Sequence, residues 1–126
     1  MSACIFPLDA GAAEARLGEL AAILVDAVEH GASVNFMSGI ATDEATGFWR
    51  RQLPGLVEGE KQLLVAEESG RLVGTILLMF AQQPNAPHRA EIGKMLVHSG
   101  QRRRGLGRRL LAEAETAARA AGRSLL

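Results

Sequence analysis

The sequence predicts an α/β fold of the α+β type, with residues 1–126 forming a single domain around a mainly antiparallel sheet. Three observations predict it. Two stretches of helical periodicity precede the first clear pair of strands, and the turn sequence Glu68-Ser69-Gly70 joins that pair. A third strand then leads through a glycine-containing loop into a last helix. A chain of 126 residues has room for one such domain.

The first forty residues are predicted to form an edge strand, a helix and a loop. Residues 3–8 form a short strand, which Pro7 confines to an edge or an end of the sheet. Residues 12–30 form a helix, because apolar residues recur there at helical spacing: Leu17, Leu20, Leu24 and Val28. Residues 31–40 are neither periodic nor charged and are expected to form a loop.

A second helix is predicted to begin at Thr42, whose side chain can cap it. Pro54 is expected to end or kink this helix. Its buried side would consist of apolar residues at helical spacing: Phe48, Trp49, Leu53 and either Leu56 or Val57.

The central strands follow. Residues 62–67 and 72–80 are predicted to form a hairpin. Residues 82–88 form a loop, and residues 89–97 form a third strand that runs antiparallel to the second.

The last helix is predicted over residues 105–121, and Gly122 ends it. Its apolar face would consist of Leu106, Leu110, Ala114, Ala117, Ala118 and Ala121. Residues 124–126 look like a new strand, which after such a helix normally lies parallel to the strand before it. We therefore expect a fifth strand that is cut short.

Charge is unevenly distributed although the net charge is zero. Residues 1–100 carry seven Lys/Arg and twelve Asp/Glu, whereas residues 101–126 carry seven Arg and two Glu. Positive charge concentrated around one loop fits a local anion site better than a surface for nucleic acid. We therefore expect no nucleic-acid partner.

Other composition features narrow the function further. Cys4 is the only cysteine, and the three histidines lack partners at ligand spacing, so no metal site is expected. There is no signal-peptide pattern and no apolar stretch near the roughly 20 residues that span a bilayer. These features predict a cytoplasmic protein without a membrane partner.

The most informative segment is Gln-Arg-Arg-Arg-Gly-Leu-Gly at residues 101–107, between the third strand and the last helix. Glycines let the backbone approach a ligand, and the first N–H groups of a helix have no intrahelical partner and favour an anion. Arginine guanidinium groups add donors that suit phosphate oxygens. The segment predicts a cradle for the diphosphate of a nucleotide-type cofactor.

Three alternative interpretations of this segment compete with the cradle. It could be a solvated basic turn before an ordinary helix. A Rossmann loop fits less well, because the third glycine is missing and the segment follows a hairpin. The arginines could instead bind nucleic acid, but this interpretation is disfavoured because no aromatic residues are interleaved with them.

Arg102-x-x-Gly105-x-Gly107, placed between strand and helix, resembles the acyl-coenzyme A signature of the GNAT superfamily of N-acetyltransferases. Within that superfamily, residues 31–37, 83–85, 89–91 and 104–108 are most similar to the tabtoxin resistance acetyltransferases. The resemblance implies two N-terminal helices on one side of the sheet and the last helix on the other. It implies transfer of an acetyl group from acetyl-CoA to the amine of a small molecule, possible acceptors being amino-acid-like compounds or β-lactam toxins.

The resemblance also implies roles for particular residues. The coenzyme would be bound by the third strand and the loop after it: Met95, Leu96, Val97, Arg102, Arg103, Arg104, Gly105, Leu106, Gly107 and Arg108. Asn35 and Phe36 would contribute to the acceptor pocket, although Phe36 could equally fill the core. Glu91 would be the general base that takes a proton from the acceptor ammonium. Apart from the resemblance, it could equally be a solvated strand carboxylate or a salt-bridge partner of Arg89 or Lys94.

Two departures from the family pattern matter. Family members continue for about fifty residues beyond the position that matches Leu126. They also commonly use a tyrosine to protonate the departing thiolate, and this sequence has no tyrosine. We therefore expect either a fragment of a longer protein or a chain that has lost part of the catalytic apparatus. The alternative function is a non-catalytic acyl-CoA-binding remnant or interaction module, with an exposed sheet edge open to self-association.

Overall fold

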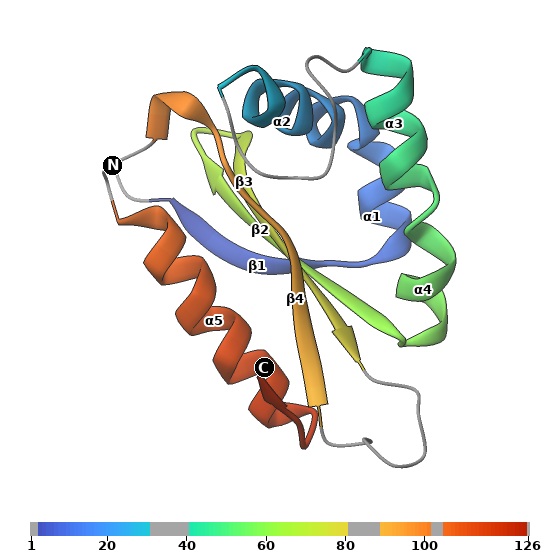
Figure 1. The fold of residues 1–126 in the computed structure, drawn as a ribbon, viewed down its shortest axis with the longest axis vertical. Coiled ribbons are helices and arrows are strands. Elements are labelled where there is room, and N and C mark those ends of the chain that lie inside the picture. The colour runs from blue at the N-terminus through green and yellow to red at the C-terminus, as the bar shows by residue number, and fades with distance from the viewer. Residues whose placement is uncertain (1–2, 31–40, 81–88, 102–104, 126) are drawn as a thin grey trace.

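The computed structural model describes residues 3–30, 41–80, 89–101 and 105–125 (Figure 1). In chain order its elements are β1 (Cys4–Leu8), α1 (Ala10–Ala15), α2 (Leu17–Glu29), α3 (Thr42–Arg50), α4 (Leu53–Glu58), β2 (Lys61–Glu68), β3 (Arg71–Phe80), β4 (Arg89–Val97), the 3₁₀ helix η1 (Ser99–Gln101), α5 (Leu106–Ala120) and β5 (Ser124–Leu125).

The sheet has the strand order β1-β2-β3-β4-β5. The first four strands pair antiparallel, and β5 pairs parallel with β4 through Arg89–Ser124 and Ala90–Leu125. This confirms the predicted mixed, mainly antiparallel sheet, with Pro7 on an edge strand. The parallel position of the short fifth strand is confirmed as well.

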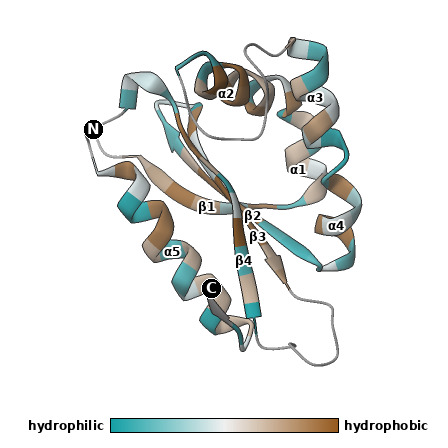
Figure 2. Ribbon diagram, in the orientation of Figure 1, coloured by the Kyte–Doolittle hydropathy of each residue, from teal (hydrophilic) through white to brown (hydrophobic). Residues whose placement is uncertain are grey.

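Two layers of helix enclose the sheet (Figure 1). Helices α1 to α4 cover one face, where they form a core with Leu63, Val65, Leu77 and Leu96. Helix α5 covers the other face and packs against Leu64, Ile76 and Leu78. Hydrophobic and hydrophilic residues alternate along α5, as a helix with one buried face requires (Figure 2). The arrangement of helices that the resemblance implied is confirmed.

The hairpin between β2 and β3 has the predicted turn. Ser69 and Gly70 both have positive φ, 53° and 80°. A two-residue turn with φ positive at both central positions matches the twist of the flanking strands, and glycine adopts such a φ without a steric cost.

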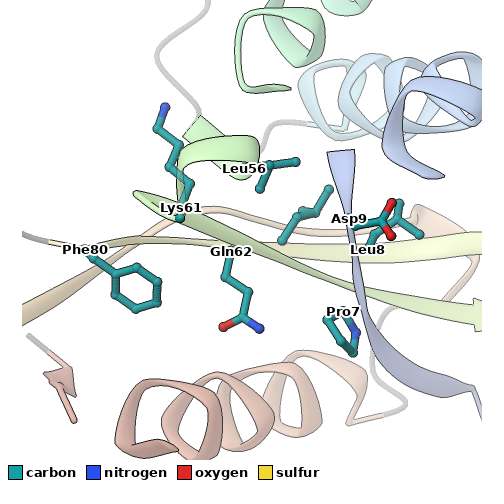
Figure 3. A pocket seen from close by; sticks show the side chains of 9 residues that line it. Pro7, Leu8, Asp9, Leu56, Lys61, Gln62 and Phe80 are labelled. Carbon is teal, nitrogen blue, oxygen red and sulfur yellow. The ribbon is translucent and has the colours of Figure 1, made fainter. Parts of the chain in front are cut away.

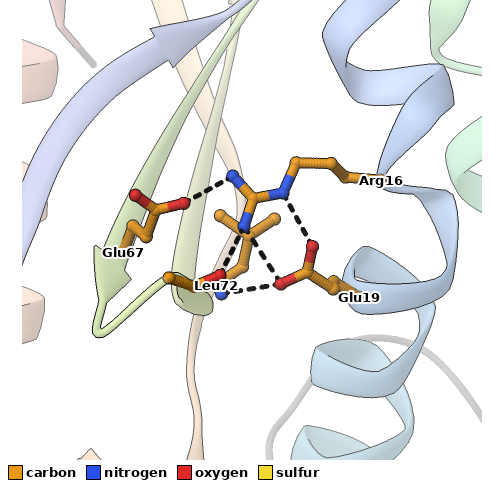
Figure 4. A network of polar contacts seen from close by, with 5 residues as sticks. Arg16, Glu19, Glu67 and Leu72 are labelled. Carbon is orange, nitrogen blue, oxygen red and sulfur yellow. Dashed lines mark hydrogen bonds and ion pairs between the residues drawn. The ribbon is translucent and has the colours of Figure 1, made fainter.

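The predicted helix over residues 12–30 is wrong in one respect, because the chain breaks at Arg16 into α1 and α2. The break places the Arg16 guanidinium against the β2–β3 hairpin (Figure 4). It donates to Glu19 at 2.7 Å, to Glu67 at 2.6 Å and to the Gly70 carbonyl at 3.1 Å. Glu19 in turn accepts from the Leu72 N–H at 3.0 Å. Contacts with residues more than fifty positions away therefore decide the break.

The second helix also differs from its prediction. Ala41 is its N-cap rather than Thr42, and α3 ends at Arg50. Pro54 then occupies the first turn of a separate short helix, α4, where its missing N–H costs nothing. Leu56 packs against the core, whereas Val57 is 71% exposed.

Ala121 is not part of the buried face of α5, because it caps the helix and is exposed. The remaining members of the predicted face are buried or partly buried: Leu106, Leu110, Ala114, Ala117 and Ala118.

Candidate functional site

A β-bulge interrupts β4 where it pairs with β3. Gly93 lies opposite Leu77 and Leu96 lies opposite Thr75, so the two residues Lys94 and Met95 face one residue of β3. Lys94 has φ 46°, a left-handed conformation that costs a non-glycine residue roughly 1–2 kcal/mol. Such strain persists only where the surroundings hold it.

Two of the contacts that hold the bulge are between described residues. The hydroxyl of Thr75, fully buried on β3, donates a hydrogen bond of 2.9 Å to the Lys94 carbonyl. The Lys94 ammonium lies 5.1 Å from the centre of the Phe48 ring on α3. A bulge bends its strand and re-aims the backbone beside it.

The other edge of β4 is largely open in the described part of the chain. On the side of β4 away from β3, β5 pairs only with Arg89 and Ala90. On that side, the predicted segment 95–97 therefore has no described strand next to it. Its side chains take different positions: Leu96 is buried, Val97 packs partly buried near α5, and Met95 is 46% exposed. Backbone groups at this edge are available to an extended ligand.

The N-terminus of α5 lies at the end of the same strand. Gly105 is the N-cap with φ 75°, which explains a glycine there. The N-cap provides no side-chain bond and no acidic residue stands in the first turn, so among the described residues no side chain is seen to cap the N–H groups of Leu106, Gly107 and Arg108. Such an end favours an anion. The predicted Arg102, Arg103 and Arg104 lie outside the described residues.

Asp26 connects α2 to the segment that precedes the glycine loop. Its carboxylate accepts hydrogen bonds from the Ser99 N–H at 2.7 Å and the Ser99 hydroxyl at 2.8 Å. His98 Nε2 lies 3.6 Å away and His30 Nδ1 3.4 Å away. Burial opposes ionisation of Asp26, but the bonds from Ser99 and the two imidazoles outweigh it and lower the pKa of the carboxyl.

Residues 35–125 match the sequence profile of the acetyltransferase (GNAT) family. The chain belongs to this family. Solved structures of similar fold include a putative acetyltransferase, YncA, from Salmonella typhimurium with its cofactor acetyl-CoA, with a TM-score of 0.70 and 22% identity. A ribosomal-protein-alanine N-acetyltransferase from Brucella melitensis has a TM-score of 0.69 and 27% identity. The PaiA N-acetyltransferase from Thermoplasma acidophilum, in complex with coenzyme A, has 0.70 and 18%.

These alignments cover nearly all of this GNAT chain but not all of its relatives. They include 98%, 94% and 97% of this chain and 66%, 68% and 75% of the three structures, respectively. The chain thus spans about two thirds of the length of the first two.

Among the predicted acceptor-side residues of this GNAT chain, Glu91 is described and Asn35 and Phe36 lie outside the described residues. Glu91 is exposed and lies opposite Met79, on the sheet face that α1 to α4 cover. It makes no ion pair with Arg89 or Lys94 among the described side chains. The carboxylate is therefore accessible from solvent at the bulged strand.

Two hollows lined by described residues lie away from the bulge. One of about 410 Å³ opens where β1 ends, between β2, β3 and α4, and includes Pro7, Gln62 and Phe80 (Figure 3). None of the predicted site residues lines it. The other, of about 260 Å³, lies between the β2–β3 turn and η1 and includes Arg71, His98 and Gly100.

Membrane-spanning helices and clustered metal ligands are both absent from the described ranges. No helix there is long and apolar enough to cross a bilayer. No group of three or more His, Cys, Asp or Glu side chains there is arranged to hold a metal ion.

The sequence prediction missed Thr75, Lys94, Asp26 and Ser99 as residues that shape the site. A threonine within an apolar strand was the one available signal at Thr75, because the residues that follow it, 76–78, are all aliphatic. Asp26 and Ser99 are separated by 73 positions, and no local pattern indicates their contact.

Proposed function

We propose that this chain binds acetyl-CoA and transfers the acetyl group to the amine of a small molecule. One observation carries the proposal: in the described part of the chain, the bulged strand β4 has an open edge beside residues 95–97, and the next α-helix, α5, begins without a side-chain cap. The edge suits the extended pantetheine arm, and the helix end suits the diphosphate. The residues present therefore fit this coenzyme.

Each part of the chain has a distinct task in this proposal. The backbone N–H groups of Leu106, Gly107 and Arg108 bind the diphosphate, with Arg102 to Arg104 adding positive charge. The backbone of Met95 to Val97 orients the pantetheine and donates to the acyl oxygen. The bound coenzyme supplies an acetyl group activated as a thioester. Glu91 takes one proton from the acceptor ammonium, so that the neutral amine can attack the thioester carbonyl. The C–N bond forms as the C–S bond breaks, and the second amine proton ends on the departing thiolate, which leaves as coenzyme A.

The relatives support the coenzyme more than the acceptor. YncA was solved with acetyl-CoA and PaiA with coenzyme A. The acceptor of this chain is proposed to be a small amine, and the finer assignment to amino-acid-like or β-lactam toxins rests on the resemblance to the tabtoxin resistance group. Two of the segments that carry that resemblance, 31–37 and 83–85, lie outside the described residues.

Gly107→Glu tests the coenzyme site. Gly107 has a helical backbone, and an added Cβ would come no closer than 4.0 Å to Val97, so the variant should fold. Its carboxylate would repel the diphosphate and weaken acetyl-CoA binding by about tenfold or more in calorimetric titration. Gly18→Glu is the matched control, since Gly18 is an exposed residue of α2 where an added Cβ would have no atom within 4 Å. Equal affinity of the Gly107→Glu variant and the wild type would contradict the proposal.

A second candidate is a non-catalytic acyl-CoA-binding module. The backbone features of β4 and α5 fit it equally well, because both concern the coenzyme and not the acceptor. Release of free thiol from acetyl-CoA over a panel of small amines separates the two candidates. Turnover supports the enzyme, whereas tight binding of acetyl-CoA without turnover supports the module.

A further inference from the structure

The hydroxyl of Thr75 occupies an unusual position for a polar group. Its side chain is completely buried, and its partners on the neighbouring strands are Val65 and Leu96, both buried and apolar. A valine would fill the same space without bringing a hydroxyl into this core. The hydroxyl donates its hydrogen bond, 2.9 Å long, to the Lys94 carbonyl within the β4 bulge.

The hydrogen bond fixes more than the carbonyl. The Lys94 carbonyl and the Met95 N–H belong to the same planar peptide unit, and no described peptide bond is cis. In a trans peptide these two groups point in opposite directions. Since the Lys94 carbonyl is directed toward Thr75 on β3, the Met95 N–H is directed away from β3, toward the edge that β5 leaves open.

The bulge needs such a restraint. An ordinary antiparallel ladder would hold this peptide through backbone hydrogen bonds, but the extra residue in β4 disrupts that ladder between Gly93 and Leu96. Lys94 also has the left-handed φ of 46°, from which a side chain–bearing residue tends to relax. The stiff, β-branched threonine presents its hydroxyl in a restricted direction.

We propose that Thr75 is a positioning residue that, through the Lys94 carbonyl, aims the Met95 N–H at the carbonyl oxygen of a bound acyl group. The inference rests on the proposed function and deepens it, because it assigns one backbone donor to the acyl oxygen and one side chain to its orientation. Thr75 itself does not contact the coenzyme. A fixed donor of this kind is most effective where charge develops on the oxygen during acyl transfer.

The test compares two ligands that differ in the acyl group. Acetyl-CoA has the acyl oxygen that Met95 would bind, and coenzyme A lacks it. Thr75→Val keeps the size of the side chain and removes the hydroxyl, Thr75→Ser keeps the hydroxyl, and Ile23→Val removes a methyl group from the buried face of α2 as a control for general core loosening. Calorimetric titration gives both affinities for each variant.

We expect Thr75→Val to lower the affinity for acetyl-CoA by about tenfold and the affinity for coenzyme A by less than about threefold, since a well-placed hydrogen bond is lost from acetyl-CoA only. Thr75→Ser and Ile23→Val should keep the wild-type ratio of the two affinities. A Thr75→Val variant that keeps this ratio, or that loses both ligands equally, would overturn the inference. A wild-type chain that binds neither ligand would instead overturn the proposed function.

If Thr75→Val does not fold, a second variant, Thr75→Cys, tests the inference. Thr75→Cys is close in size and carries only a weak donor, so its affinity ratio should fall between those of wild type and a full loss. In the folded variant, the three-bond coupling between the amide and α protons of Lys94 reports its φ by nuclear magnetic resonance. We expect that coupling to change in Thr75→Cys and not in Ile23→Val. An unchanged ratio together with an unchanged coupling would overturn the inference.

Discussion

Glu91 and Lys94 stand three residues apart on β4 and differ in how the fold holds them. Lys94 is restrained by Thr75 through its carbonyl and by Phe48 beneath its ammonium. Glu91 is exposed at the other end of the same short segment, opposite Met79. At the scale of the residue, the strand thus combines a restrained backbone feature with a carboxylate that solvent can reach.

Glu91→Gln is expected to lower kcat/KM for amine acetylation at neutral pH by roughly 10²–10⁴, because glutamine cannot accept the proton of the ammonium. Affinity for acetyl-CoA should stay at the wild-type value, since Glu91 lies before the segment proposed to bind it. Steady-state rates and calorimetry provide the two measurements, and Glu113→Gln on the exposed side of α5 is the control. Wild-type turnover in Glu91→Gln would remove Glu91 from the mechanism.

At the scale of the element, Asp26 ties α2 to η1, the segment that precedes the glycine loop. The two hydrogen bonds from Ser99 hold η1 against α2, and η1 leads into the glycine loop. Gln101 adds a bond of 3.2 Å to Glu68 at the end of β2. The start of the loop is therefore set by a helix and a strand that precede it by more than thirty residues.

Asp26→Asn should destabilise the fold by about 1–3 kcal/mol, because the amide replaces a charged acceptor of two hydrogen bonds with a neutral one that has a single oxygen. Urea unfolding followed by circular dichroism measures the change. Glu29→Gln is the matched control, since Glu29 is an exposed carboxylate on the same helix, whereas the two bonds from Ser99 go to Asp26. A similar loss in both variants would show that helix charge, rather than the bond to Ser99, determines the effect.

At the scale of the whole molecule, one sheet separates two apolar cores, and ionic contacts tie the N-terminal helices to its turns. The Arg16 guanidinium lowers the pKa of Glu19, and the bonds from Ser99 help to lower that of Asp26 against the cost of burial. The same Glu19 carboxylate, together with Glu67, raises the pKa of Arg16. Glu19 and Asp26 are thus more strongly ionised in the folded than in the unfolded protein.

A pH dependence of stability follows from Glu19 and Asp26. Their ordinary values are 4.5 for Glu19 and 3.8 for Asp26, and the folded pKa of each lies lower. The unfolded chain therefore takes up protons first as the pH falls, so their contribution is complete above about pH 5 and is lost as the pH falls through the folded pKa values. We expect the urea concentration at the unfolding midpoint to decrease in the wild type as the pH is lowered below about 4. The decrease should be smaller in Asp26→Asn. Parallel curves for the two proteins would contradict this.

The sequence by itself determined the elements whose signals are local. Turn chemistry at Ser69-Gly70, the strand at 89–97 and the apolar face of α5 all depend on neighbours within a few residues, and the structure confirms them. The glycine loop also indicates an anion site from its own residues, which stays a prediction.

Only the tertiary structure decided the features that depend on distant partners. The break at Arg16 depends on Glu67 and Gly70, the brace at Asp26 depends on Ser99, and the bulge at Lys94 depends on a threonine 19 positions earlier on the adjacent strand. Hydrophobic periodicity carries no information on which polar groups meet across elements, because it records burial and not hydrogen-bond geometry. The direction of a single backbone N–H at the open edge is set by such a contact.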